Sequence, residues 1–338
     1  MQNKIIFFCG KISFLSFGFH LLFTKVGHNA WISILAGTLL GAFIIYLFSL
    51  LKKSVNGDIN KELKKYKILN IIYKFIFILI YSFIIILTLS LLPLFVNTFY
   101  LINTPKIVTI VPFFLVAMYV ASKGEIVLFK LSNLLFVFSI GLILLTFLAT
   151  FKYLDFSVLF PILDVSKINI FESILIYASL SSIPTIITIS YNNSFKNELK
   201  LYFFTSLILL SICLITILML DHELLKMYSF PAYTVLKRIS ILEFVENIEN
   251  FLSFVWYFDY MITLASGLLN LKNTINNKFI YYIISAMLVL FTVYFLGMNY
   301  QYLNQFVYNV YYGLYIILFL IILLLIILKF KKTKQSSN

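Results

Sequence analysis

Long apolar runs recur along almost the whole chain and are separated by short polar segments. Most of these runs reach the roughly 20 residues that a helix needs to cross a bilayer, and they do not alternate polar and apolar residues as the strands of a transmembrane β-barrel do. The pattern therefore predicts an all-α polytopic membrane protein, with 1–338 forming one transmembrane domain. The ten predicted spans are about 5–23, 30–51, 68–101, 107–121, 126–150, 169–189, 201–220, 249–270, 279–298 and 305–329.

The composition strengthens this prediction. Hydrophobic residues make up 62% of the chain and charged residues 12%, whereas an ordinary soluble domain is roughly 25% charged. The formal net charge of +13 would suit a nucleic-acid-binding protein, but the lysines gather at the ends of the apolar runs. That distribution is the one by which membrane proteins fix their orientation. We therefore expect the lipid bilayer as a partner and no nucleic acid.

Two lysine-rich segments, 52–67 and 329–335, are predicted to face the cytoplasm, because cytoplasmic loops carry an excess of lysine and arginine. An even number of predicted spans separates them, so both can lie on the same side of the cell membrane. Both chain termini are then cytoplasmic as well. The predicted outer loops are 24–29, 102–106, 151–168, 221–248 and 299–304.

Ten spans divide into two sets of five, about 1–150 and about 169–329, which would cross the membrane in opposite directions. Inverted five-helix repeats of this kind build the leucine-transporter-like fold, in which the first and sixth helices are interrupted at the midplane around the substrate. This expectation rests on the number and polarity of the spans, since the sequence has no convincing internal repeat.

Helix-breaking and hydroxyl-bearing residues occur in the two spans that this fold would place at the substrate. In 169–189, Pro184 removes a backbone hydrogen bond, and neighbouring serines could bond the freed groups or a ligand. In 5–23, Gly18 offers a second interruption. Serine also commonly serves helix packing in membranes, and that alternative stays open. The candidate substrate-binding residues are Ser16, Gly18, Tyr177, Ser179, Ser181, Ser182 and Pro184.

The segment 221–260 is the main departure from the apolar pattern. It contains Arg238, the only arginine of the chain. We expect Arg238 to pair with a glutamate at the start of the following helix: Glu243, Glu246 or Glu249. The positive end of the helix dipole also stabilises carboxylates at this position, which explains Glu246 and Glu249 without a functional role.

Asp259 lies about ten residues after Glu249, hence about 15 Å further along the helix, near the middle of the bilayer. A carboxylate at that depth costs several kcal/mol and needs a cavity or a partner. Two readings stay open: a coupling-ion or proton site, or a structural explanation, which is a pairing with a lysine or with the backbone or else a span assigned one turn too deep. Lys11, inside the first span, is expected to extend its side chain to the cytoplasmic interface.

Residues that typically catalyse reactions or bind metals form no recognisable constellation. There is no glycine-rich phosphate loop and no serine, histidine and aspartate in polar surroundings that would suit a catalytic triad. The three histidines, His20, His28 and His222, are scattered without the spacing of a metal site. Cys9 and Cys213 lie in apolar runs, as small buried hydrophobic residues would. We expect neither an enzyme, nor a metal, nor a cofactor.

Three stretches of the chain carry a family resemblance: VGHNAWISILAGTLLG (26–41), NTPKIVTIVPFFLVAMYVASKGEIVLFKLSNLLF (103–136) and SFPAYTVLKRISILEFVENIENFLSFVW (229–256). In this order and spacing they resemble the B-subunit family of spore germinant receptors, a branch of the amino acid–polyamine–organocation transporter superfamily. The chain departs from that family at Asn247, where an arginine is usual. It also has a short first helix and lacks the glutamate often found in the middle of the sixth.

The resemblance implies a receptor subunit that senses an amino acid or a similar small nutrient in the spore inner membrane. Its partners would be a membrane A subunit and a lipoprotein C subunit, and its ligand would bind between the first and sixth helices. The resemblance also implies a special role for Glu249. A second hypothesis is a proton- or cation-coupled amino acid permease, which would use the same pocket.

Overall fold

The structure, a computed structural model, describes residues 4–54, 67–191, 195–238, 248–275 and 277–295, together with positions 309, 313, 316 and 319. Every regular element in these ranges is a helix. The predicted tenth span, 305–329, lies almost entirely outside the described residues, as do Glu243, Glu246 and Asn247.

Predicted spans one to nine are all present as helices close to their expected bounds, because in lipid the backbone must satisfy its own hydrogen bonds and the helix does so locally. The first span consists of α1 (Ile5–Ser13), a π-helical turn η1 (Phe14–Gly18) and α2 (Phe19–Val26). The others are α3 (Ala30–Ser54), α5 (Lys67–Phe99), α6 (Lys106–Ser122), α7 (Glu125–Thr150), α8 (Lys167–Tyr191), α9 (Phe195–Met219), α12 (Ile248–Ile275) and α13 (Lys278–Phe295).

The surface of the bundle is apolar enough for lipid. Four segments of the described chain are long and apolar enough to cross a membrane: Ile5–Leu50, Asn70–Phe99, Glu125–Tyr153 and Lys196–Met219. On the outer helices α7 and α13, Leu148 and Leu290 are 75% and 70% exposed. Soluble monomers rarely expose large apolar faces of this kind, so these faces contact the bilayer.

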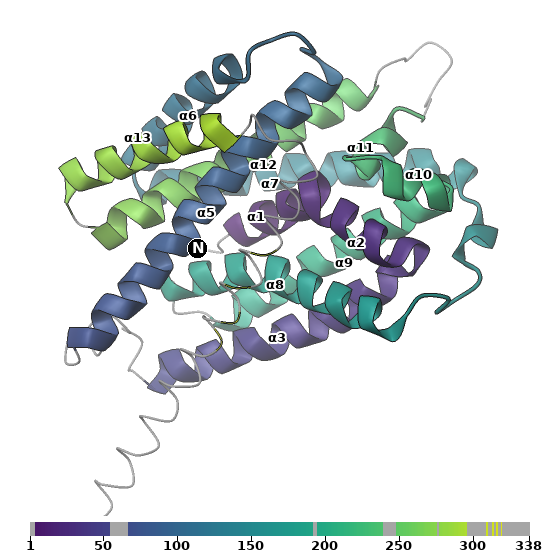
Figure 1. Ribbon diagram of the computed structural model, residues 1–338, viewed down its shortest axis with the longest axis horizontal. Coiled ribbons are helices and arrows are strands. Elements are labelled where there is room, and N and C mark those ends of the chain that lie inside the picture. The colour runs from purple at the N-terminus through teal and green to yellow at the C-terminus, as the bar shows by residue number, and fades with distance from the viewer. Residues whose placement is uncertain are drawn as a thin grey trace, which may run out of the picture.

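The long helices form two groups, which Figure 1 shows side by side. In one group α5, α6, α12 and α13 pack against one another, and in the other α3, α8 and α9 pack together with α1 and α2. The main contact between the groups is that of α1 with α12. Helix α1 is therefore central, and all of its residues are buried.

Glycines let α3 approach α8 and α9 closely. A Cβ atom at Gly37 would meet the carbonyl of Ile174 and the ring of Tyr177, and one at Gly41 would meet the hydroxyl of Tyr202. Small residues at such crossings bring membrane helices within hydrogen-bonding reach. The Tyr202 hydroxyl donates to the backbone carbonyl of Thr38 at 3.2 Å.

Three of the predicted outer loops, 24–29, 151–168 and 221–248, meet at one end of the bundle. They contain the short helices η2 (Gly27–Asn29), η3 (Phe151–Tyr153), η4 (Phe156–Leu159), α10 (His222–Met227) and α11 (Pro231–Leu236), of which α10 and α11 lie together in Figure 1. Asn29 donates to the carboxylate of Asp164 at 2.6 Å, which joins two of these loops. At the other end, Asn273 donates to Glu125 at 3.0 Å. Which end faces the cytoplasm stays a prediction.

Candidate functional site

The first span widens where an interruption was expected. Residues 14–18 form a π-helical turn that ends at Gly18, where a Cβ atom would overlap the ring of Phe14. That ring packs on Tyr177 of α8, with the centroids 4.6 Å apart. Ser16, in the same turn, donates its hydroxyl to the carbonyl of Ile12. This turn thus contacts α8, and single π turns inside α-helices frequently occur at functional sites.

The sixth span is not interrupted at Pro184, contrary to the sequence-based expectation, because α8 continues through it. Hydroxyl groups brace the helix on the N-terminal side of the proline. Ser179 donates to the carbonyl of Ile176 at 2.9 Å, and Ser181 donates to that of Tyr177 at 2.8 Å. These two serines therefore fit the packing alternative.

Ser182 differs from its neighbours. It is fully buried, and its hydroxyl has no hydrogen-bond partner among the described residues. A buried hydroxyl without a partner costs free energy. Of the serines predicted in α8, Ser182 is therefore the one whose hydroxyl is available to a ligand or a water molecule.

A small cavity of about 10 Å³ lies between α1, α5, α8 and α12, where the predicted fold places the substrate. It has room for about one water molecule. Ser16 and Pro184 line it, together with Tyr260 and Thr263 of α12. The other predicted substrate-binding residues, Gly18, Tyr177, Ser179, Ser181 and Ser182, do not line this cavity.

Asp259 pairs with Lys11. The ammonium nitrogen lies 3.0 Å from a carboxylate oxygen, and the two side chains are 2% and 0% exposed. The prediction that Lys11 extends to the cytoplasmic interface is wrong, because α1 is surrounded by other helices and offers no path to the interface. The ammonium also lies 4.9 Å from the ring centroid of Phe7. Of the two readings for Asp259, the pairing with a lysine is present.

This buried pair is incomplete in its hydrogen bonding. Within the described ranges, no group other than Lys11 offers the Asp259 carboxylate a hydrogen. A lysine ammonium has three donors and a carboxylate has two acceptor oxygens. Buried ion pairs recover the cost of leaving water only when additional hydrogen bonds satisfy these remaining groups. The pair therefore has unused capacity for a third, polar partner.

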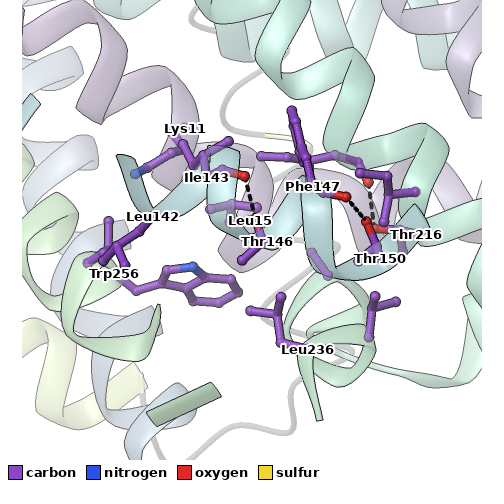
Figure 2. A pocket seen from close by; sticks show the side chains of 15 residues that line it. Lys11, Leu15, Leu142, Ile143, Thr146, Phe147, Thr150, Thr216, Leu236 and Trp256 are labelled. Atoms are coloured by element: carbon purple, nitrogen blue, oxygen red, sulfur yellow. Dashed lines mark hydrogen bonds between the residues drawn. The ribbon is translucent and has the colours of Figure 1, made fainter. Parts of the chain in front are cut away.

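A larger cavity of about 70 Å³ lies on another side of α1. Its walls come from α1, η1, α7, α9, α11 and α12, and Lys11, Thr146 and Trp256 are among the side chains that line it (Figure 2). The lining includes none of the predicted substrate-binding residues. The sequence did not predict this cavity, because its lining residues come from segments that are distant along the chain. The only signal was Trp256, at the point where the polar segment enters the eighth span.

The predicted pairing of Arg238 with a glutamate is not found among the described residues. The guanidinium group donates instead to the backbone carbonyl of Met219 at 3.3 Å. Glu243 and Glu246 lie outside the described residues, and of Glu249 only the backbone is described, in the first turn of α12. Arg238 thus joins the end of α11 to the end of α9.

Two histidines that are far apart in the sequence meet at the outer end. His28 and His222 approach through their Nδ1 atoms at 3.3 Å, while Nε2 of His28 lies 2.7 Å from the carbonyl of Pro161. A carbonyl only accepts, so Nε2 of His28 carries a hydrogen and its Nδ1, in the neutral ring, accepts from His222. Burial lowers the pKa of His222, and the neighbouring Lys226 and His28 lower it further.

A bundle of apolar helices around a central helix with a buried ion pair defines a polytopic, all-helical integral membrane protein. Comparison with protein families identifies the particular group. The family model described as spore germination protein, the spore permease family, matches residues 11–298. The chain therefore belongs to this family of spore germination proteins, which confirms the resemblance found in the sequence. A comparison with curated proteins finds no significant match.

Proposed function

We propose that this protein is the membrane B subunit of a spore nutrient-germinant receptor and that it senses an amino acid or a similar small nutrient. Its partners would be a membrane A subunit and a lipoprotein C subunit in the spore inner membrane. The family match supports the role in germination. The observation that carries the sensing role is the incomplete Lys11–Asp259 pair at the contact of α1 with α12.

A ligand that binds next to this pair would act on the contact between the two helix groups. Ligands shift a protein toward a conformation only by binding it better than the alternative. A polar ligand that satisfies the free groups of Lys11 and Asp259 would favour one packing of α1 against α12. The partner subunits would then respond to this packing.

We also propose that the chain consists of two inverted repeats, at about 1–150 and 169–329. The helix contacts support this proposal. The spans can be numbered from one to ten in chain order, and each can then be exchanged for the span five places away. This exchange converts the α3–α8 contact (spans two and six) into the α9–α1 contact (spans seven and one). It also converts the α6–α12 contact (spans four and eight) into the α13–α5 contact (spans nine and three). The contacts α1–α8, α3–α9 and α5–α12 map onto themselves. A two-fold pseudo-symmetry in the membrane plane has this property.

A second candidate function is a proton- or cation-coupled amino acid permease. Asp259 favours it, because a buried carboxylate near the bilayer midplane is a common position for a coupling site. In a permease, a cation or proton would compete with Lys11 for the carboxylate. In a sensor, the pair would reform after the ligand leaves, and no solute would cross.

The deciding experiment combines reconstitution and genetics. We expect proteoliposomes that contain the protein to bind a labelled amino acid without accumulating it above protein-free vesicles. Deletion of the gene in the spore-forming host should abolish germination in response to that amino acid and leave other nutrients effective. Concentrative uptake that a proton or cation gradient drives, with normal germination of the deletion strain, would establish the permease instead.

A further inference from the structure

The 70 Å³ cavity has mostly apolar walls, yet it borders a charge that needs further hydrogen-bond partners. Lys11 lines the cavity, and Figure 2 shows the ammonium group at its margin. Among the described residues, the ion-pair partner of this ammonium is Asp259, at 3.0 Å. A lysine ammonium has three donors, so the contact with Asp259 leaves donors for other acceptors.

Trp256 brings a second donor to the same cavity. Its side chain is 4% exposed, and its ring packs on Phe95 with the centroids 4.9 Å apart. In the part of the chain that the structure describes, nothing accepts a hydrogen bond from its indole N–H. Figure 2 shows the indole nitrogen on the edge of the ring nearest to Lys11. Buried tryptophans usually find an acceptor for this group.

Three threonines that line the cavity provide acceptors. The hydroxyl groups of Thr146, Thr150 and Thr216 donate their hydrogens to backbone carbonyls of their own helices, at 2.7, 2.9 and 2.7 Å. Each hydroxyl oxygen keeps a lone pair that can still accept. The walls therefore combine unused donors with unused acceptors, and a suitable occupant both accepts and donates hydrogen bonds.

Water meets this requirement, and the volume suits it. One buried water molecule needs about 10–15 Å³, so a cavity of about 70 Å³ has room for about five. Cavities with purely apolar walls stay dry, but a lysine ammonium is a strongly hydrated point charge. Ionisable side chains inside membrane proteins almost always face a water-filled cavity or the interior of the bundle. Lys11 faces both.

The cavity extends from Lys11 to the end of the bundle where the loops 24–29, 151–168 and 221–248 meet. Thr150 is the last residue of α7, and Leu236 is the last residue of α11. Leu236 is half-buried, and the next residue, Lys237, is exposed. The lining thus ends beside polar loop residues that contact solvent.

We propose that this cavity is a water-filled passage from the loop end of the bundle to the Lys11–Asp259 pair. Its water molecules accept hydrogen bonds from Lys11 and Trp256 and donate to the three threonines. Asp259 does not line the cavity, so its free acceptor capacity remains for a ligand. The passage lies on the α7–α9–α11 side of α1, apart from the small cavity at the α1–α8 interface.

Hydration of Lys11 makes the contact of α1 with α12 reversible. Separating opposite charges costs far more in a dry interior than beside water. Water in the passage solvates the ammonium when it leaves Asp259, so the two helices can move apart and return. The inference goes beyond the proposed function, because a receptor and a permease both need this contact to open and close.

Hydroxyl-radical footprinting of the full-length protein in lipid nanodiscs tests for the water. A short X-ray pulse forms radicals from water in place, and mass spectrometry locates the side chains that they oxidise. Trp256 is expected to be oxidised in spite of its burial. Tyr202 and Phe23 are equally buried and line neither cavity, so they should stay protected relative to the denatured protein. Ala232→Leu fills part of the cavity and should reduce the oxidation of Trp256.

Exchange of the indole N–H in D₂O tests the connection to solvent. The chain has two tryptophans, so Trp31→Phe leaves Trp256 as the single indole, whose exchange ultraviolet resonance Raman spectroscopy can follow. Leu236→Phe enlarges the side chain at the loop end of the passage and should slow this exchange. Leu21→Phe is the matched control, because Leu21 is also half-buried but does not line the cavity.

The outcomes are distinct. Protection of Trp256 equal to that of Tyr202 would mean that the cavity is dry and would overturn the inference. Oxidation that Ala232→Leu leaves unchanged, while Tyr202 stays protected, would place the water outside this cavity. Exchange that Leu236→Phe and Leu21→Phe affect equally would refute the route from the loop end. None of these results touches the proposed receptor role, which the germination assay tests separately.

Discussion

Lys11 of the first membrane helix and Asp259 of the eighth lie 3.0 Å apart, both buried, where one group of helices meets the other. A buried ion pair of this kind is poor evidence of net stabilisation, because two charges have left water to form it. The two charged side chains nevertheless depend on each other, because removing either one leaves the other buried without a counter-charge. Four predictions follow from this pair and from neighbouring features of the fold.

Lys11→Met is expected to lower the free energy of unfolding by about 3–5 kcal/mol, because it leaves the Asp259 carboxylate without a partner. Asp259→Asn should have a similar effect by stranding the ammonium. The double variant Lys11→Met/Asp259→Leu should recover most of the loss. Thermal unfolding in detergent and immunoblots of membranes measure these changes. A double variant as unstable as the two singles combined would contradict the coupling.

Ser182→Ala and Ser181→Ala form a matched pair in α8. Ser182→Ala should leave stability unchanged or raise it by up to about 1 kcal/mol, because it removes a buried hydroxyl without a partner. Ser181→Ala should lower it by about 1 kcal/mol, since this hydroxyl bonds Tyr177 and lies 3.1 Å from that of Tyr202. Thermal unfolding of both variants is the measurement. The opposite order would mean that Ser182 is hydrogen-bonded.

Protonation of His222 is expected to destabilise the outer loops at acidic pH, because it adds a charge to a partly buried ring beside Lys226. The pKa of His222 is lowered in the folded protein, so the unfolded chain binds a proton first and stability rises with pH in this window. The contribution of neutral His222 to stability should be complete above about pH 6.5, the ordinary pKa of histidine. It should be lost as the pH falls through the lowered pKa of the folded protein.

Hydrogen exchange of the outer loops between pH 5 and 8 would follow this change, with His222→Gln as the control. Protonated His222 would lie beside the charge of Lys226, which Glu223 and Asp164 only partly offset. An identical pH dependence in His222→Gln would show that other groups are responsible.

The orientation in the membrane can be tested at two exposed sites. Ser122 is exposed at the C-terminal end of α6, and Met227, at the end of α10, is 74% exposed. In a background without Cys9 and Cys213, an impermeant thiol reagent added to intact cells should label Met227→Cys and not Ser122→Cys. Reversed labelling would invert the assignment, and labelling of both would mean that the two loops do not lie on opposite sides.

The positions of the helices could be predicted from the sequence because lipid imposes a minimum apolar length and forbids other backbone conformations. The number of spans between the outer loops also places these loops on one side of the membrane, so their proximity could be expected. The course of α8 through Pro184 could not be predicted. Whether a proline breaks a membrane helix depends on local hydroxyl groups, such as those of Ser179 and Ser181, and on the neighbouring helices.

The buried environment of Lys11 could not be predicted from the sequence either. An apolar run has the same length and hydropathy whether its helix is central or faces lipid, so the side chain was expected to reach the interface. The opposite charges of Lys11 and Asp259 were both visible, but nothing in their spacing indicated that the first and eighth spans touch. The 70 Å³ cavity could not be predicted for a related reason, because its lining residues come from distant segments of the chain.

The distance of Lys11 from Asp259 along the chain has a consequence for biosynthesis. The first helix enters the membrane during translation, long before the eighth is made, and a lysine near the centre of a lone helix costs about 2.5–3.5 kcal/mol on insertion scales. Until α12 arrives, that lysine must be tolerated by the insertion machinery, by lipid headgroups or by water. The packing of α12 against α1 is thus what neutralises the charge that the first helix carries into the bilayer.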